Sequence, residues 1–174
     1  MEHITTFTGE DFTPLSPNIE QIHIRDIAHS LSLMCRANGH FTQFFSIAQH
    51  SINCAKEAKA RGLSEKIQLA CLLHDASEAY LSDITRPIKR HLPTYIEAEV
   101  NLQNAIYLKF LGSLLSDEEK VHVKQIDDDM LVCEFNALMK KKVFDRIVVL
   151  RSRPCFDLVD FCAVENEFVS LCPF

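Results

Sequence analysis

An apolar run near the middle of the chain constrains the fold more than any other feature. Between Ile67 and Leu73 almost every side chain is apolar. The next ten residues contain one histidine and three carboxylate side chains, those of His74, Asp75, Glu78 and Asp83. A helix that is apolar on all sides belongs in a protein core. We therefore expect a central helix over residues 64–80 whose buried stripe becomes polar at its end.

Helical periodicity recurs along the rest of the chain, which has only four glycines and six prolines in 174 residues. So few helix-breaking residues favour an all-α fold. Thr94-x-x-Glu97 and Ser116-x-x-Glu119 are capping-box patterns, and each predicts the start of a helix. Besides the central helix, periodicity predicts helices over residues 24–37, 46–60, 117–141 and 157–171.

Two segments lack a clear helical period. Residues 4–13 are rich in threonine and phenylalanine around Gly9, which predicts a small N-terminal β-hairpin. Residues 143–155 fit a helix and a strand equally well. The length suits one domain of residues 1–174. Its expected parts are an N-terminal arm (1–20), a helical core (24–141) and a C-terminal helix packed on that core (142–174).

Composition argues against several classes of protein. The net charge is −6 and no basic block is present, which disfavours a nucleic-acid partner. Seven cysteines without a Cys-x-x-Cys pair indicate buried, reduced thiols in a cytoplasmic protein, and they disfavour a zinc–thiolate site. No opening segment reads as a signal peptide and no apolar run is long enough to span a bilayer, so we expect no membrane association.

Helical phase places several polar side chains on buried faces. His50 shares the inner face of its helix, His74 and Glu78 continue the stripe of the central helix, and Asp127 falls in the stripe of helix 117–141. The next two aspartates rotate away from that stripe. Buried carboxylates are costly unless they are paired, and a divalent cation shared with the histidines would remove that cost. Imidazole and carboxylate ligands suit Mn, Fe, Co, Zn or Mg. From spacing alone, core histidines and a solvated acidic face remain equal alternatives.

A resemblance favours the metal site. The stretch HDASEAYLSDITRPIK, together with SIAQHS around His50 and HVKQIDDDML around Asp127, resembles the HD-domain phosphohydrolases, specifically the small branch of bacterial 5'-deoxynucleotidases. His-Asp alone is a weak motif. The ordered series of a histidine, His-Asp-x-x-Glu, Asp-x-x-x-Pro-x-Lys and Val-Lys-x-x-Asp is specific, and the similarity covers about residues 20–140.

The resemblance implies an all-helical HD-domain bundle and assigns roles to particular residues. Glu78 would act on the attacking water or the leaving group, with Asp83 close by, and Arg36 matches an arginine that contacts phosphate. Lys89 is the second candidate for phosphate contact. The ligands implied for one divalent metal ion are His50, His74, Asp75 and Asp127.

The sequence also departs from the monophosphatases. They commonly carry a tryptophan beside the phosphate-binding arginine, whereas this chain has no tryptophan and Ala37 follows Arg36. CRANGHFTQFFSIAQH and TGEDFTPLSPN look closer to phage and prophage members of the superfamily, which include dATP triphosphohydrolases. Arg86 adds a cation that would help to bind a longer phosphate chain, although a loop arginine is more often only solvated.

The resemblance therefore implies a metal-dependent hydrolase that acts on deoxynucleotides at the 5'-phosphate. The substrate could be a monophosphate or a triphosphate. The alternative is a non-catalytic HD module that senses nucleotides or serves as a scaffold. Members of this family are often dimers, which leaves a homo-oligomer open.

Overall fold

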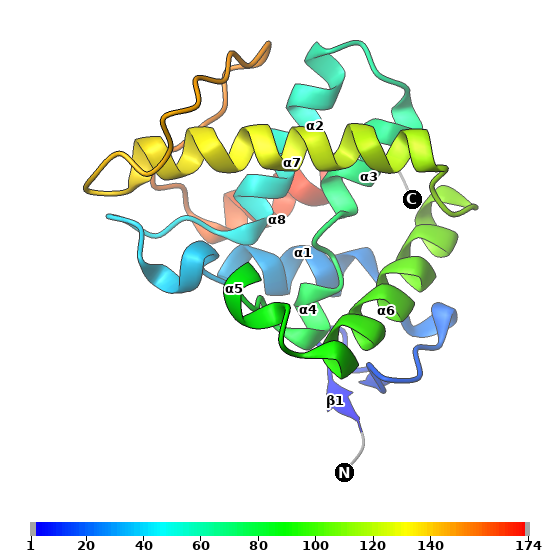
Figure 1. Ribbon diagram of the computed structural model, residues 1–174. Coiled ribbons are helices and arrows are strands. Elements are labelled where there is room, and N and C mark those ends of the chain that lie inside the picture. Colours follow the sequence, from blue (N-terminus) through cyan, green and yellow to red (C-terminus); the bar gives the residue numbers. More distant parts are fainter. Residues whose placement is uncertain (1–2, 173–174) are drawn as a thin grey trace.

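Helices make up most of the protein in a computed structural model that describes residues 3–172 (Figure 1). This confirms the expected all-α fold. The main helices are α1 (Ile24–Leu33), α2 (Ile47–Ala60), α3 (Glu65–Leu73), α6 (Pro93–Leu111), α7 (Asp117–Leu138) and α8 (Phe161–Ser170). The short ones are the 3₁₀ helices η1 (Ile19–Gln21) and η2 (Arg36–Gly39), and the α-helices α4 (Glu78–Leu81) and α5 (Arg86–Lys89).

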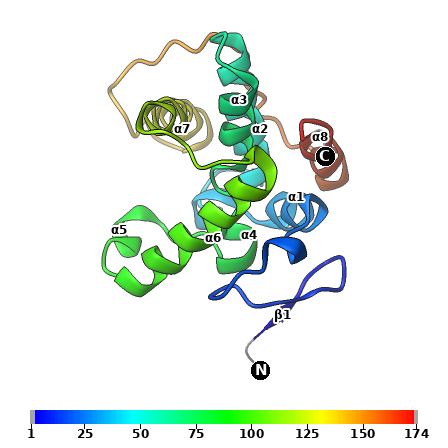
Figure 2. The same ribbon diagram turned by 90° about the vertical axis from the view of Figure 1, so that its right-hand side faces the viewer.

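The helices form layers around α2 and α3. Figure 2 shows α7, viewed nearly end-on, on one side of this pair, with α1 and α8 on the other side. Eleven of the fourteen residues of α2 are buried, so this helix is enclosed on almost all sides. It is therefore at least as central as α3, the helix that the apolar run predicted to be central. No helix within residues 3–172 has the length and hydropathy that a membrane span requires.

The expected N-terminal hairpin is present. Strands β1 (Ile4–Thr5) and β2 (Asp11–Phe12) are antiparallel, with Ile4 opposite Phe12. The carboxylate of Asp26 on α1 accepts hydrogen bonds from the backbone N–H of Thr8, at 2.7 Å, and from its hydroxyl, at 2.9 Å. These bonds tie the hairpin turn to the helical layers.

The first helix is shorter than the predicted span 24–37. It ends at Leu33 because the chain becomes extended there: Cys35 and Ser46 form an isolated antiparallel bridge, and the Arg36 N–H donates to the Phe45 carbonyl at 2.9 Å. Ala37 then adopts a left-handed conformation with φ of 55°. Arg36 therefore lies at the start of a tight loop rather than at the end of a helix.

The central helix is not continuous over 64–80, so that prediction was wrong. α3 ends at Leu73, and a turn of four residues precedes α4. In this turn the Ala76 N–H donates to the Leu73 carbonyl and the Glu78 N–H to the Asp75 carbonyl, both at 3.0 Å. The side-chain amide of Gln103 on α6 stabilises the break, because its Nε2 donates to the Leu73 carbonyl (2.7 Å) and its Oε1 accepts from the Ser77 N–H (3.2 Å).

Only one of the two capping boxes forms. The Ser116 hydroxyl accepts from the Glu119 N–H and the Glu119 carboxylate accepts from the Ser116 N–H, as predicted. The box at Thr94 is wrong because α6 already begins at Pro93, and proline is favoured at the first helical position, where no N–H bond is needed. α7 and α8 are shorter than predicted, and Asp160 caps α8 through the N–H groups of its first turn.

Residues 143–155 form neither a helix nor a strand. This irregular segment continues to the start of α8, and successive turns of α2 present Gln49, Asn53 and Glu57 to its backbone. Asn53 exchanges two hydrogen bonds with the backbone of Cys155, at 3.0 and 3.2 Å. Gln49 donates to the Asp157 carbonyl at 3.1 Å. Side chains thus satisfy backbone groups that a ladder would otherwise pair.

Glu57 is the strongest of these attachments. Its fully buried carboxylate accepts from the Arg151 N–H at 3.0 Å, from the Ser152 N–H at 2.7 Å and from the Ser152 hydroxyl at 2.6 Å. Arg61 adds an ion pair at 2.8 Å. Burial alone would raise the pKa of Glu57, but the bonds from Ser152 and Arg151 hold it below its usual value.

We expect Glu57→Gln to lower the free energy of unfolding by about 2 kcal/mol or more. A glutamine cannot replace all of these charge-assisted bonds, and each is typically worth about 1.5–3 kcal/mol. Urea denaturation at neutral pH measures the change. Glu97→Gln, at an exposed position on α6, is the matched control and should stay within about 0.5 kcal/mol of the parent. Equal stabilities of the two variants would contradict this account of the segment.

Candidate metal site and adjoining cavity

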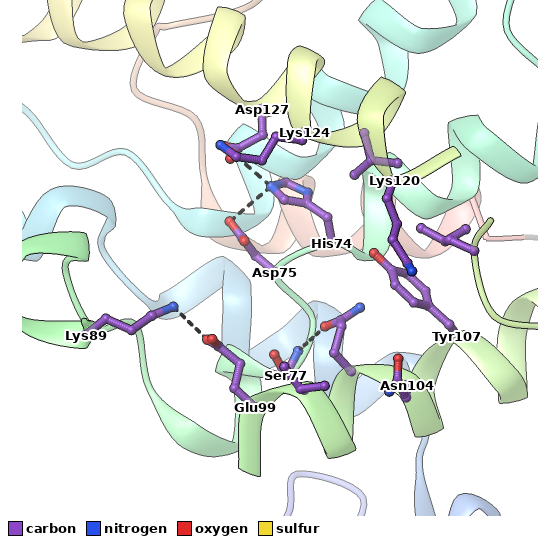
Figure 3. Close-up of a pocket in the computed structure, with 14 residues that line it drawn as sticks. His74, Asp75, Ser77, Lys89, Glu99, Asn104, Tyr107, Lys120, Lys124 and Asp127 are labelled. Atoms are coloured by element: carbon purple, nitrogen blue, oxygen red, sulfur yellow. Dashed lines mark hydrogen bonds and ion pairs between the residues drawn. The ribbon is translucent and has the colours of Figure 1, made fainter. Parts of the chain in front are cut away.

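Three elements bring two histidines and two aspartates together. His50 comes from α2, His74 and Asp75 from the turn after α3, and Asp127 from α7. The Nε2 atoms of the two histidines lie 3.1 Å apart. The Asp75 Oδ2 lies 3.3 Å from His74 Nε2 and 3.8 Å from His50 Nε2. The Asp127 Oδ1 lies 3.3 Å from His50 Nε2 and 3.7 Å from His74 Nε2. Figure 3 shows His74, Asp75 and Asp127 converging.

Hydrogen bonds fix the orientation of both imidazole rings. His50 Nδ1 donates to the buried carboxylate of Glu134 at 2.7 Å, and His74 Nδ1 donates to the Cys71 carbonyl at 2.8 Å. Because each Nδ1 carries a proton, each Nε2 presents a lone pair in the neutral ring. Two such lone pairs 3.1 Å apart repel each other unless a proton or a cation lies between them.

Cys54 is a further potential ligand, since His50, Cys54 and His74 form a group that could hold a metal ion. Its Sγ lies 3.6 Å from His50 Nε2. Burial, with the carboxylates of Glu134 and Asp127, raises the pKa of this thiol well above its usual value. A thiol binds metal as the thiolate, so the two ionised aspartates are better ligands than Cys54.

Charges within the cluster balance one another. Burial opposes ionisation of Asp127, but hydrogen bonds to His50 and His74 lower its pKa below the usual range. Likewise burial opposes and His74 favours ionisation of Asp75, whose pKa is also lowered. Burial by itself lowers the pKa of His74, yet Asp75 and Asp127 raise it well above the usual value. A cation that binds here would therefore displace a proton from His74.

Arg36 lies inside this cluster, with 9% of its surface exposed. Its Nε donates to Glu134 at 2.9 Å, and its terminal nitrogens lie 3.4 Å from Asp75 and 3.7 Å from Asp127. Burial by itself lowers the pKa of Arg36, but these three carboxylates raise it above its ordinary value. The guanidinium is thus held beside the candidate ligands rather than on the open surface.

Glu134 is the residue of the candidate site that the sequence interpretation missed. It is completely buried and accepts hydrogen bonds from both His50 and Arg36. A detectable signal existed, because Glu134 follows Asp127 by seven residues on α7 and therefore lies on the same face two turns later. A buried carboxylate on that face requires a partner.

Glu78 and Asp83 lie next to the cluster, as does Lys89. Burial and the carboxylates of Asp75 and Asp83 raise the pKa of Glu78 to about 9, and burial also raises the pKa of Asp83. The buried Oε2 of Glu78 has no hydrogen-bond partner among the described residues. Lys89 Nζ lies 3.6 Å from Glu78 Oε1 and donates to Glu99 at 2.6 Å.

Stability should therefore depend on pH through Glu78. In the unfolded chain a glutamate releases its proton near pH 4.5, whereas the folded protein keeps it up to about pH 9. The unfolded state binds fewer protons between these values, so this group lowers stability as pH rises. In chelator-treated protein, the Glu78→Gln variant should therefore gain stability relative to the parent as the pH rises. The difference in the free energy of unfolding, variant minus parent, should be larger at pH 8 than at pH 5 by at least about 1 kcal/mol. Urea titrations at both pH values measure this, and a pH dependence identical to the parent would contradict it.

Arg86 is more exposed but is not free of contacts. It lies on α5 and donates to the Asp127 Oδ2 at 2.6 Å and to the Asp128 Oδ1 at 2.9 Å. Asp128 faces outward toward Lys124, at 2.6 Å. Asp129 also turns away from the histidines, as expected, but it is buried and pairs with Arg61 and Arg146 on the far side of α7.

A cavity of about 390 Å³ adjoins the cluster. It lies between α6 and α7, and His74, Asp75 and Asp127 contribute to its wall (Figure 3). This volume is within the range of small-molecule sites. Apolar side chains of both helices line the rest, together with the polar side chains of Ser77, Lys89, Glu99, Asn104, Lys120 and Lys124.

Comparisons with known proteins show relatives but no activity. No family model matches the chain. YfdR of Escherichia coli K12 is 39% identical over 110 residues, which are 63% of this chain and 59% of YfdR. A protein of Rhodobacter capsulatus is 36% identical over 127 residues, which are 69% of this chain and 64% of that protein. The chain thus matches about three fifths of the length of these relatives, and both are described only as uncharacterized proteins.

Proposed function

We propose that the protein is a metal-dependent phosphohydrolase of the HD-domain type that acts on deoxynucleotides at the 5'-phosphate and releases the nucleoside. The observation that carries this proposal is the convergence of His50, His74, Asp75 and Asp127 at the wall of a cavity of about 390 Å³. A protonated carboxyl group, Glu78, lies beside them. The resemblance in the sequence motifs supplies the reaction class.

The spacing of the four side chains suits a shared ion. Metal–nitrogen bonds of about 2.1 Å place neighbouring ligand atoms about 3.0 Å apart in an octahedron and about 3.4 Å apart in a tetrahedron. The five distances measured between ligand atoms run from 3.1 to 3.8 Å. When bound, a divalent ion (Mn, Fe, Co, Zn or Mg) would supply Lewis acidity toward a phosphoryl group and a water molecule.

The surrounding residues fit the remaining tasks. Glu78 keeps its proton at neutral pH and can therefore donate it to the leaving 5'-oxygen, with Asp83 as the neighbouring carboxylate that helps to hold its pKa high. Arg36 can present its terminal nitrogens to a phosphate beside the metal ligands. Both Lys89, beside Glu78, and Arg86, beside Asp127, supply further positive charge from α5.

Metal content tests the ligand set. The purified protein should hold about one divalent ion per chain, Asp127→Asn should lose it, and Asp128→Asn should keep it. The reason is that Asp127 faces both histidines, whereas Asp128 faces Lys124 and Arg86. Elemental analysis after gel filtration measures the stoichiometry. Retention of the ion by the Asp127 variant, with loss from the Asp128 variant, would place the site elsewhere.

Product identity tests the reaction. A screen of deoxynucleoside mono- and triphosphates with several divalent metals should yield the nucleoside, together with orthophosphate from a monophosphate or intact triphosphate from a triphosphate. Glu78→Gln should keep metal and bind nucleotide but turn over roughly 10²-fold more slowly, the usual scale for general acid–base catalysis. Release of a nucleoside diphosphate would show attack at another phosphorus. Metal binding without turnover of any nucleotide would favour a non-catalytic HD module.

A further inference from the structure

The cavity beside the cluster is a groove between two helical faces of matching period. Along α6 it is lined by Val100, Asn104 and Tyr107, and along α7 by Val123 and Asp127. These positions are three, four or seven residues apart, so each set forms one stripe along its helix. Asp127 lies at the end of the groove next to the histidines. The remainder of the groove extends toward the loop that joins α6 to α7.

The inner walls of this remote part are mostly uncharged. The two lysines that α7 contributes are on the rim, with side chains 62% and 63% exposed, and each already pairs with an aspartate of its own helix. The ring of Tyr107 is buried, and Val123 is buried opposite it. An uncharged, flat group therefore suits the remote part better than a phosphate chain does.

Two adjacent amides on α6 differ in their bonding. Gln103 is fully engaged, because it bridges the Leu73 carbonyl and the Ser77 N–H. Asn104 is half-buried and lines the cavity, but its side-chain amide makes no hydrogen bond within residues 3–172. Figure 3 shows the Asn104 side chain on α6, below the ring of Tyr107 in this view. Its amide offers a donor next to an acceptor, the pair that a nucleobase edge can match.

We propose that Asn104 is the residue that discriminates among nucleobases, by hydrogen-bonding a base edge that lies against Tyr107 and Val123 in the groove. This rests on the proposed function, since the 5'-phosphate would lie at His74 and Asp127. With the phosphate at that end, the base occupies the remote part of the groove. Within residues 3–172, Asn104 is a side chain lining the cavity whose amide has no hydrogen-bond partner, so it is available to the base.

Binding of the four 2'-deoxynucleosides tests the assignment without requiring hydrolysis or metal. Titration calorimetry should show that the protein prefers one base. Asn104→Leu should weaken binding of the preferred nucleoside roughly tenfold or more and reduce the difference among the four. Asn104→Asp has nearly the same shape but lacks the donor, so it should change the order of preference. Asn101→Leu, at an exposed position one turn earlier on α6, should bind like the parent.

The opposite results are distinct. Equal weakening of all four nucleosides by the Asn104 variants, no weakening at all, or undetectable binding of every nucleoside would overturn the assignment. So would displacement of the nucleoside by inorganic tripolyphosphate in metal-free protein, because the groove would then hold the phosphate chain. Base-selective binding that depends on Asn104, without phosphate release from any nucleotide, would support Asn104 while refuting the hydrolase.

Discussion

The arrangement of the candidate site depends on the hydrogen bonds that the buried carboxylate of Glu134 accepts. This carboxylate accepts hydrogen bonds from two groups in different parts of the chain, His50 on α2 and Arg36 in the loop before it. Burial opposes its charge, but His50 and Arg36 hold its pKa below the usual value. Removing one partner of a buried, charged pair typically costs about 3–5 kcal/mol. One oxygen of Glu134, Oε2, therefore stabilises the loop of Arg36. The other, Oε1, holds the ring of His50 so that its Nε2 faces the other candidate ligands.

The polar end of the apolar run has a physical explanation in the break between α3 and α4. A continuous helix would have placed His74 and Glu78 one above the other. The turn instead sets Asp75 beside His74, with 3.3 Å between the Asp75 carboxylate and His74 Nε2, and starts a new helix at Glu78. Gln103 makes this break stable by bonding the groups that the helix leaves open. The same amide joins α6 to the site, so one wall of the groove is tied to the ligand-bearing turn.

Sequence reasoning recovered the parts of the fold that depend on local patterns. The spans of α2 and α7, the hairpin and the capping box at Ser116 follow from periodicity and side-chain chemistry within a few residues. The inward direction of Asp127 follows from helical phase, and the structure places it by the histidines. The break at His74, the early end of α1 and the course of residues 143–155 could not be predicted. They are fixed by Gln103, by the bridge between Cys35 and Ser46, and by side chains of α2, which are remote in sequence. Burial of Asp129 was missed for the same reason, because its partner Arg61 lies at the end of α2, 68 residues earlier in the chain.

The attachment of the irregular segment to α2 has a consequence for the order in which the protein can form during synthesis. α2 carries His50, yet its outer polar face is completed only by the backbone of residues 151–157, and its inner face by Glu134. These partners are about a hundred positions downstream, and such long-range contacts are made late in folding. A nascent chain that has emerged only as far as Asp75 already contains His50, His74 and Asp75, but it lacks Glu134 and the backbone groups that bond to Gln49, Asn53 and Glu57. The candidate ligands therefore come together in the last stage of folding, after Asp157, the partner of Gln49, has been synthesised.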